Sequence, residues 1–214
     1  MKEKVRYFSN WKNFKTLSFG LFSTLFFLWV YFHTEQFIPS EFKDTFFKAF
    51  IGYGFLHALI FVNTETRNKL YNAKFIPFVV RMLIFTAISL FVFYFILAKI
   101  DPLGETAYSL FKSLPWWLAA SHMLIFATIE STVWQGWLDD KLGRPVSALT
   151  AGVFHWGIWP GSAFIVIISA GLLFAFFTLV HLFFRSDKND LAPVIGVHTG
   201  FNFVKLGLLL SPLK

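Results

Sequence analysis

Four polar residues lie inside stretches of apolar sequence where charged and polar side chains are unusual. They are Glu130, His155, His198 and Asn202. An ionisable side chain in such a stretch is costly, so it is a candidate for function. A carboxylate beside an imidazole can activate a water molecule, and a second imidazole with an amide can stabilise an oxyanion. These residue types are therefore suited to the hydrolysis of a carbonyl compound.

Two other chemistries are open to the same part of the chain. Glu130, His155 and His198 form a known set of zinc ligands that leaves a coordination position free. The H-E-x-x-H spacing that fixes a local zinc site is not found in the sequence. Ser131 offers a nucleophile, but it follows Glu130 directly and so points about 100° away from it around a helix.

The composition is that of a membrane protein. Of 214 residues, 56% are hydrophobic and 14% are charged, whereas soluble domains carry about 25% charged residues. There are no cysteines, which excludes disulfides, thiolate metal sites and a cysteine nucleophile. We predict an all-α fold, a polytopic bundle of transmembrane helices that forms one domain over residues 1–214.

Seven apolar segments are expected to cross the membrane, for which about 20 residues are needed. One run is too long for a single crossing and breaks at Trp159-Pro160-Gly161, because proline and glycine interrupt helices. A re-entrant or interfacial segment around residues 99–112 would make eight. The expected spans are 16–32, 46–62, 75–98, 114–138, a short and a full span within 145–184, and 191–210.

The distribution of Lys and Arg predicts the orientation. Twelve lie in the segments expected on one side and five in those on the other, and the more basic side is the cytoplasmic one. The N-terminus is then cytoplasmic and the C-terminus outside. This alternation between loops also argues against a nucleic-acid partner, despite the net charge of +7. The residues expected on the side of the N-terminus are Arg67, Lys69, Lys74, Lys141, Arg144, Arg185 and Lys188.

Depth predicts which polar groups meet. At 1.5 Å per residue, Glu130, His155 and His198 each lie about 12–16 Å from the cytoplasmic edge, near the middle of a hydrocarbon core about 30 Å thick. Asn202 lies one turn from His198 on the same helix face. The alternative is that these groups only bond to one another as contacts between helices. Three more histidines fall in apolar runs, of which the last lies near the inner boundary: His57, His122 and His181.

Three motifs resemble those of a known family. Residues 130–138, ESTVWQGWL, resemble the first motif of the CAAX-protease and bacteriocin-processing family of intramembrane proteases, E-E-x-x-x-R followed by G-x-L. Residues 151–155, AGVFH, resemble the second, F-x-x-x-H. Residues 198–202, HTGFN, match the last, H-x-x-x-N. The resemblance covers about residues 114–210 and none of the first three spans.

The chain departs from the family pattern at three positions. Ser131 stands in place of the second glutamate, Gln135 in place of the arginine, and Ala151 in place of the phenylalanine. The glutamate and arginine of the family look like a supporting ion pair. Their joint loss leaves neither charge unpaired in a low dielectric, so Ser131 and Gln135 are expected to support the site.

The resemblance implies roles for the four polar residues. Glu130 is the general base, His155 holds the water with it, and His198 and Asn202 bind the oxyanion. It also implies an integral protein of a bacterial or archaeal plasma membrane, surrounded by lipid, that cleaves a membrane-associated peptide or lipidated protein tail without a cofactor.

Two other functions stay open because of the changed motif. One is a catalytically altered relative that acts as a membrane partner or scaffold. The other is an enzyme that uses the same site for acyl or lipid chemistry.

Overall fold

The computed structural model describes residues 10–63, 75–97, 115–158, 161–187 and 189–205. Within these ranges the chain is helical and contains no strand, so the predicted all-α fold is confirmed. The segment predicted around residues 99–112 lies outside the described residues. The long helices are α1 (Asn10–Thr34), α2 (Lys43–Val62), α4 (Phe75–Leu97), α6 (Trp116–Val133), α8 (Arg144–Ile158), α9 (Ala163–Phe184) and α10 (Ala192–Lys205).

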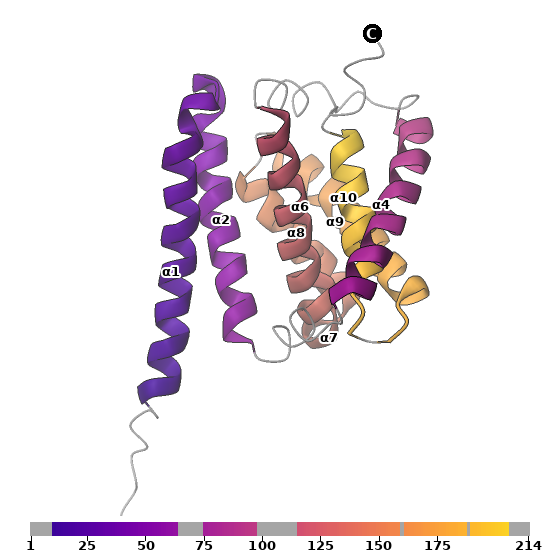
Figure 1. Ribbon diagram of the computed structural model, residues 1–214, viewed down its shortest axis with the longest axis horizontal. Helices are drawn as coiled ribbons and strands as arrows, with labels where there is room; N and C mark the ends of the chain where they lie inside the picture. The colour runs from indigo at the N-terminus through magenta and orange to yellow at the C-terminus, as the bar shows by residue number, and fades with distance from the viewer. Residues whose placement is uncertain (1–9, 64–74, 98–114, 159–160, 188, 206–214) are drawn as a thin grey trace, which may run out of the picture.

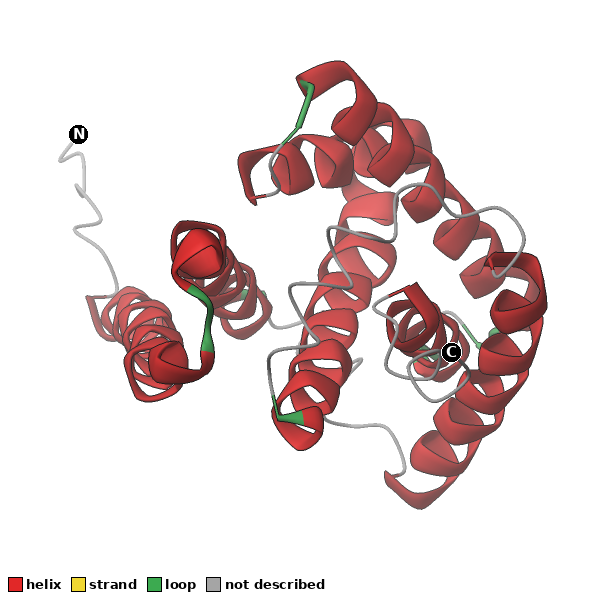
Figure 2. Cartoon of the chain, turned by 90° about the horizontal axis from the view of Figure 1, so that it is seen from above, coloured by secondary structure: helices red, strands yellow, loops and turns green. Residues whose placement is uncertain are grey.

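Consecutive long helices run in alternating directions along the bundle (Figure 1). Helices α1 and α2 form an antiparallel pair at one side (Figures 1 and 2). Helix α10 contacts α4, α6 and α9 and lies among them (Figure 2). As a consequence, side chains of the last described helix meet those of three earlier ones.

Two of the described helices are long and apolar enough to cross a membrane, Phe75–Phe93 within α4 and Ala163–Phe184. Only 6% and 22% of these windows are buried, unlike the core helix of a soluble protein. The sequence predicts seven spans, whereas only these two of the described helices meet the criterion of length and apolar character. The described parts of α8 and α10 have 15 and 14 residues, which at 1.5 Å per residue gives roughly 21–23 Å, less than a hydrocarbon core of about 30 Å.

Glycines bring α4 and α10 close together. A Cβ built on Gly196 would lie 2.8 Å from Phe85 Cβ, and one built on Gly200 would lie 2.9 Å from Ser89 Cβ. The Ser89 hydroxyl donates a hydrogen bond of 3.0 Å to the carbonyl oxygen of Val197. The G-x-x-x-G spacing lets two helix backbones approach, which is typical of helix contacts in membranes.

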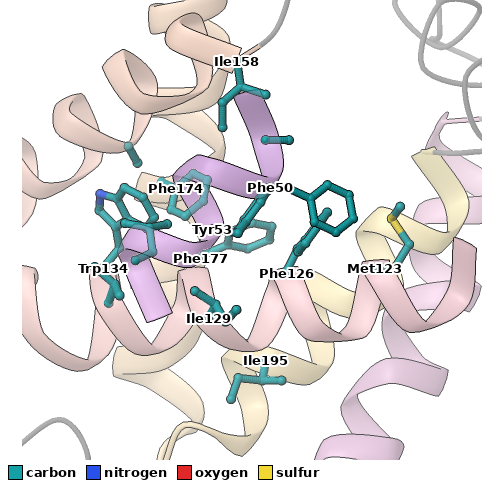
Figure 3. Close-up of a cluster of buried hydrophobic side chains, with 14 of the residues drawn as sticks. Phe50, Tyr53, Met123, Phe126, Ile129, Trp134, Ile158, Phe174, Phe177 and Ile195 are labelled. Atoms are coloured by element: carbon teal, nitrogen blue, oxygen red, sulfur yellow. The ribbon is translucent and has the colours of Figure 1, made fainter. Parts of the chain in front are cut away.

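The core between α2, α6 and α9 is largely aromatic (Figure 3). The rings of Tyr53 on α2 and Phe126 on α6 are stacked with their centroids 3.7 Å apart. Phe174 and Phe177 of α9 are fully buried and pack against His198 of α10. Aromatic pairs of this kind add to the stability gained from burial, so they fix α2 and α9 against the helices that carry the polar residues.

Helix α6 does not end as a regular α-helix. It continues into a π-helical turn, Trp134–Leu138, and then into the short helix α7, Asp139–Leu142. The Thr178 hydroxyl donates a hydrogen bond of 2.9 Å to the Asp139 carboxylate, which joins α7 to α9. Gly143 follows with φ of 79°, a conformation that favours glycine, and the chain reverses there into α8.

Candidate functional site

Glu130 lies at the meeting point of three helices. Its side chain on α6 is 2% exposed. His155 Nε2 on α8 lies 3.4 Å from Glu130 Oε1, and His198 Nε2 on α10 lies 3.2 Å from Glu130 Oε2. The structure thus brings together three of the residues that the sequence places at one depth.

Helix packing explains why the two histidines reach Glu130. Gly196 and Gly200 face α4, and His198 lies two residues from each, about 200° around the helix. It therefore faces away from α4, toward α6. On α8, a Cβ built on Gly152 would lie 3.0 Å from the carbonyl carbon of Ile167. This close contact with α9 sets the position from which His155 extends.

Tyr53 is a site residue that the sequence analysis missed. Its hydroxyl donates a hydrogen bond to Glu130 Oε1, from a helix to which the motif resemblance does not extend. One signal was present in the sequence. A tyrosine hydroxyl in the middle of an apolar helix needs a partner, and Gly52 and Gly54 on either side indicate that other helices come close.

The hydrogen bonds of His155 define where its protons lie. Its Nδ1 is 2.8 Å from the carbonyl oxygen of Ala151. A carbonyl oxygen only accepts hydrogen bonds, so Nδ1 carries a proton. His155 Nε2 faces a carboxylate oxygen of Glu130, which also only accepts when ionised. A proton carried by His155 Nε2 would therefore lie between the imidazole and the Glu130 carboxylate.

His198 connects Ser131 to the glutamate. Ser131 Oγ lies 3.2 Å from His198 Nδ1. In the tautomer that donates from Nε2 to Glu130, the Nδ1 atom of His198 accepts a hydrogen bond from the Ser131 hydroxyl. Phe177 stacks on the imidazole at 4.2 Å, and Phe174 packs against it edge-on at 5.5 Å. We call Glu130, Tyr53, Ser131, His155 and His198 the Glu130 cluster.

Asn202 does not join this cluster. It is half-buried one turn beyond His198 on α10. Within the described part of the chain, no hydrogen bond links its side chain to another residue. Its role as an oxyanion donor stays a prediction.

Gln135 is buried on the π-helical turn, with 3% of its surface exposed. Neither Nε2 nor Oε1 of its side chain has a hydrogen-bond partner among the described residues. Gln135 and Ser131 therefore do not replace the expected ion pair with a hydrogen bond between them.

The three other histidines of the apolar segments contact other groups than Glu130. None of them takes part in the cluster. They bond to Ser23 (His57), to a backbone carbonyl of the same helix (His122) and to Arg185 (His181).

Over the described ranges, no group of three or more His, Asp or Glu side chains is arranged to hold a metal ion. Each imidazole Nε2 of the Glu130 cluster faces a carboxylate oxygen rather than a common point between three side chains. Zinc binding by Glu130, His155 and His198 would require the carboxylate to leave these hydrogen bonds.

No protein-family model matches the chain, and neither a curated protein nor a solved structure matches it. The site is therefore interpreted from its own geometry, and the three motif resemblances stay predictions.

Proposed function

We propose that the chain is a glutamate-dependent intramembrane endopeptidase that cleaves a membrane-associated peptide or the tail of a lipidated protein. The observation that carries this proposal is the Glu130 carboxylate, held between His155 and His198 in an apolar interior. A carboxylate that shares a proton with an imidazole is a suitable general base for water. The order and spacing of the three motifs favour the same chemistry.

The outer surface supports a membrane location. Helices α4 and α9 are long and apolar, and large apolar side chains cover their outer faces. Soluble monomers rarely expose continuous apolar patches of this size. In our proposal the seven long helices lie in a bacterial or archaeal plasma membrane, with the α7 end cytoplasmic and the C-terminus outside. The most exposed side chains include Leu21, Phe22, Phe75, Ile76, Phe91, Phe164, Leu172 and Phe183.

The proposed reaction adds water to a peptide bond. Glu130 takes a proton from the water as its oxygen bonds to the carbonyl carbon, and the carbonyl oxygen becomes an oxyanion. The Nε2–H of His198 turns from Glu130 to this oxyanion, with Asn202 as a second donor. One such donor is typically worth about 3 kcal/mol. The C–N bond then breaks as the proton shared with His155 passes to the leaving nitrogen, which gives a carboxylic acid and an amine.

The test is Glu130→Gln, which keeps the shape of the side chain and removes the base. Activity is expected to fall by about 10²–10⁴-fold, while folding survives because a neutral amide is cheaper to bury than a carboxylate. The measurement is complementation of a deletion strain at matched expression, with new peptide ends in the membrane fraction identified by mass spectrometry. Full complementation would contradict the proposal and favour a scaffold.

A metal chelator separates the cofactor-free reaction from the zinc alternative. The purified protein is expected to keep its activity after chelation. Loss of activity that returns with zinc would move Glu130, His155 and His198 from acid–base roles to metal ligands.

One observation favours a second candidate function, acyl transfer to serine. Ser131 Oγ, His198 and Glu130 form a hydroxyl–imidazole–carboxylate series, the same order of groups as in a serine hydrolase but with the two imidazole nitrogens exchanged. Ser131 Oγ would bond to an ester carbonyl carbon, with its proton taken by His198 Nδ1. That proton would then pass to the alkoxy oxygen as the ester C–O bond breaks, which gives an acyl-serine and a free alcohol. Glu130 contacts His155 and His198 directly, whereas Ser131 contacts His198 alone, so the endopeptidase is the function that the geometry supports better.

A further inference from the structure

The side-chain amide of Gln135 is buried with its hydrogen-bonding capacity unused within the described chain. Both Nε2 and Oε1 are shielded from solvent and lack a partner there. Burying an unpaired amide is unfavourable, and folded proteins pair nearly all such groups. An amide with both its donor and its acceptor unused is therefore open to a ligand.

The two residues beside Gln135 both have packing roles. The Trp134 indole nitrogen donates a hydrogen bond of 3.3 Å to Thr150 Oγ1. A Cβ built on Gly136 would lie 3.3 Å from Leu191 Cδ1. Gln135 stands between them on a π-helical turn, a geometry that occurs frequently at functional sites. Packing of this turn thus explains Trp134 and Gly136 but does not explain why position 135 carries a buried amide.

Gln135 lies one helical turn from the Glu130 cluster. It follows Ser131 by four residues, so the two side chains leave the helix on one side with their Cβ atoms about 6 Å apart. Ser131 contacts His198, and His198 contacts Glu130. A substrate group held by Gln135 would therefore lie on the side of α6 that carries Ser131, which is linked to the carboxylate through His198.

We propose that Gln135 binds the backbone of an extended peptide whose scissile bond is held at Glu130. The proposal rests on the endopeptidase function and names its substrate class. A primary amide presents an acceptor and donors side by side, which match the N–H and C=O groups of a peptide backbone.

This contact selects conformation rather than sequence. Backbone N–H and C=O groups are the same in every residue, but in an α-helix they are already bonded to one another. A segment that reaches Gln135 must therefore be unwound. The substrate class is an extended stretch of chain, such as a tail or a segment that unwinds in the site, and not an intact transmembrane helix.

The experiment compares two fluorescein-labelled probes bound to the purified full-length protein in detergent. One probe is a short peptide of alternating Ala and Leu. The other has the same side chains with its backbone amides replaced by esters, which removes the N–H donors. The wild type is expected to bind the amide probe about tenfold more tightly than the ester probe, as follows from one or two lost hydrogen bonds.

Gln135→Leu is expected to bring that ratio close to one. The matched control is Thr132→Val, because Thr132 is buried on α6 with its hydroxyl bonded at 2.6 Å to Thr128 O, and it should keep the wild-type ratio. Uptake of probe by detergent micelles is common to all variants and cancels in the comparison. A ratio that Gln135→Leu leaves unchanged, or a wild type that shows no preference, would overturn the proposal.

Two further readings in the same samples separate the possible failures. Gln135→Leu is expected to raise the melting temperature, and a lower one would mean that the amide has a structural partner, which also overturns the proposal. Cleavage of the amide probe is measured by mass spectrometry. Preference for the amide without cleavage leaves the Gln135 contact standing and removes the endopeptidase. Cleavage of the amide probe, with a binding ratio that Gln135→Leu leaves unchanged, would leave the endopeptidase standing and remove the Gln135 contact.

Discussion

Ser89 and Gly200 touch across the contact between α4 and α10, where a side chain at position 200 would not fit. A Cβ built on Gly200 would overlap Ser89 Oγ and lie 2.9 Å from Ser89 Cβ. The same helix presents His198 on its other side to Glu130. The approach of α10 to α4 therefore sets how close the imidazole comes to the carboxylate.

Gly200→Ala and Gly196→Ala are expected to destabilise the protein, each by about 1–3 kcal/mol, because the added methyl group overpacks the interface. The matched control is Gly157→Ala on α8, where a Cβ would meet nothing within 4 Å and alanine favours the helix by up to about 1 kcal/mol. Thermal unfolding in detergent measures all three. Equal melting temperatures for Gly200→Ala and Gly157→Ala would contradict the close contact.

Tyr53→Phe is expected to lower activity by about tenfold or more, since hydrogen bonds to charged groups are worth about 1.5–3 kcal/mol. The phenyl ring keeps the stack on Phe126, so stability should change little. Tyr31→Phe is the control, because its hydroxyl donates a hydrogen bond of 3.3 Å to Lys43 O, away from the cluster. Initial rates of probe cleavage in detergent decide the matter. Equal rates for the two variants would remove Tyr53 from the site.

Ser131→Ala separates the two candidate reactions. An endopeptidase that uses Glu130 loses only the partner of His198 Nδ1, and its activity should fall by less than about tenfold. An enzyme with a Ser131 nucleophile should lose more than about 10⁴-fold. Labelling of the wild type by a fluorophosphonate probe gives the independent reading. Ser121→Ala, which alters an exposed hydroxyl on the same helix, is the control for both measurements.

The topology is tested with single cysteines, since the chain has none of its own. Lys141→Cys on α7 and Glu41→Cys in the turn before α2 lie at opposite ends of the bundle (Figure 1). A reagent that does not cross membranes should label Glu41→Cys in intact cells and reach Lys141→Cys only after lysis. The reverse pattern would place the α7 end outside and overturn the predicted orientation.

Counting residues from the edge of each apolar segment was sufficient to predict that Glu130, His155 and His198 lie at one level. Residue rise along a helix is nearly constant, and ionisable groups in apolar surroundings seek one another. Asn202 shares a face with His198 but not its contacts. A shared face specifies direction only, whereas contact also depends on how the helices cross.

Other features depend on tertiary packing that a sequence pattern does not encode. Tyr53 is one of six tyrosines, and only the docking of α2 on Phe126 brings its hydroxyl to Glu130. The π-helical turn was missed because an apolar run shows no change in period there. The prediction of seven spans depends on apolar length, and the described parts of the helices that carry His155 and His198 are shorter than a full crossing.

The position of α10 has a consequence for biosynthesis. It is the last described helix to leave the ribosome, yet it lies among α4, α6 and α9, which are made before it. Those helices must leave room for α10 or separate to admit it. Until α10 enters, Glu130 has Tyr53 and His155 but lacks His198. In the proposed reaction a nascent chain would therefore lack one oxyanion donor, and hydrolysis would reach its full rate only once α10 is in place.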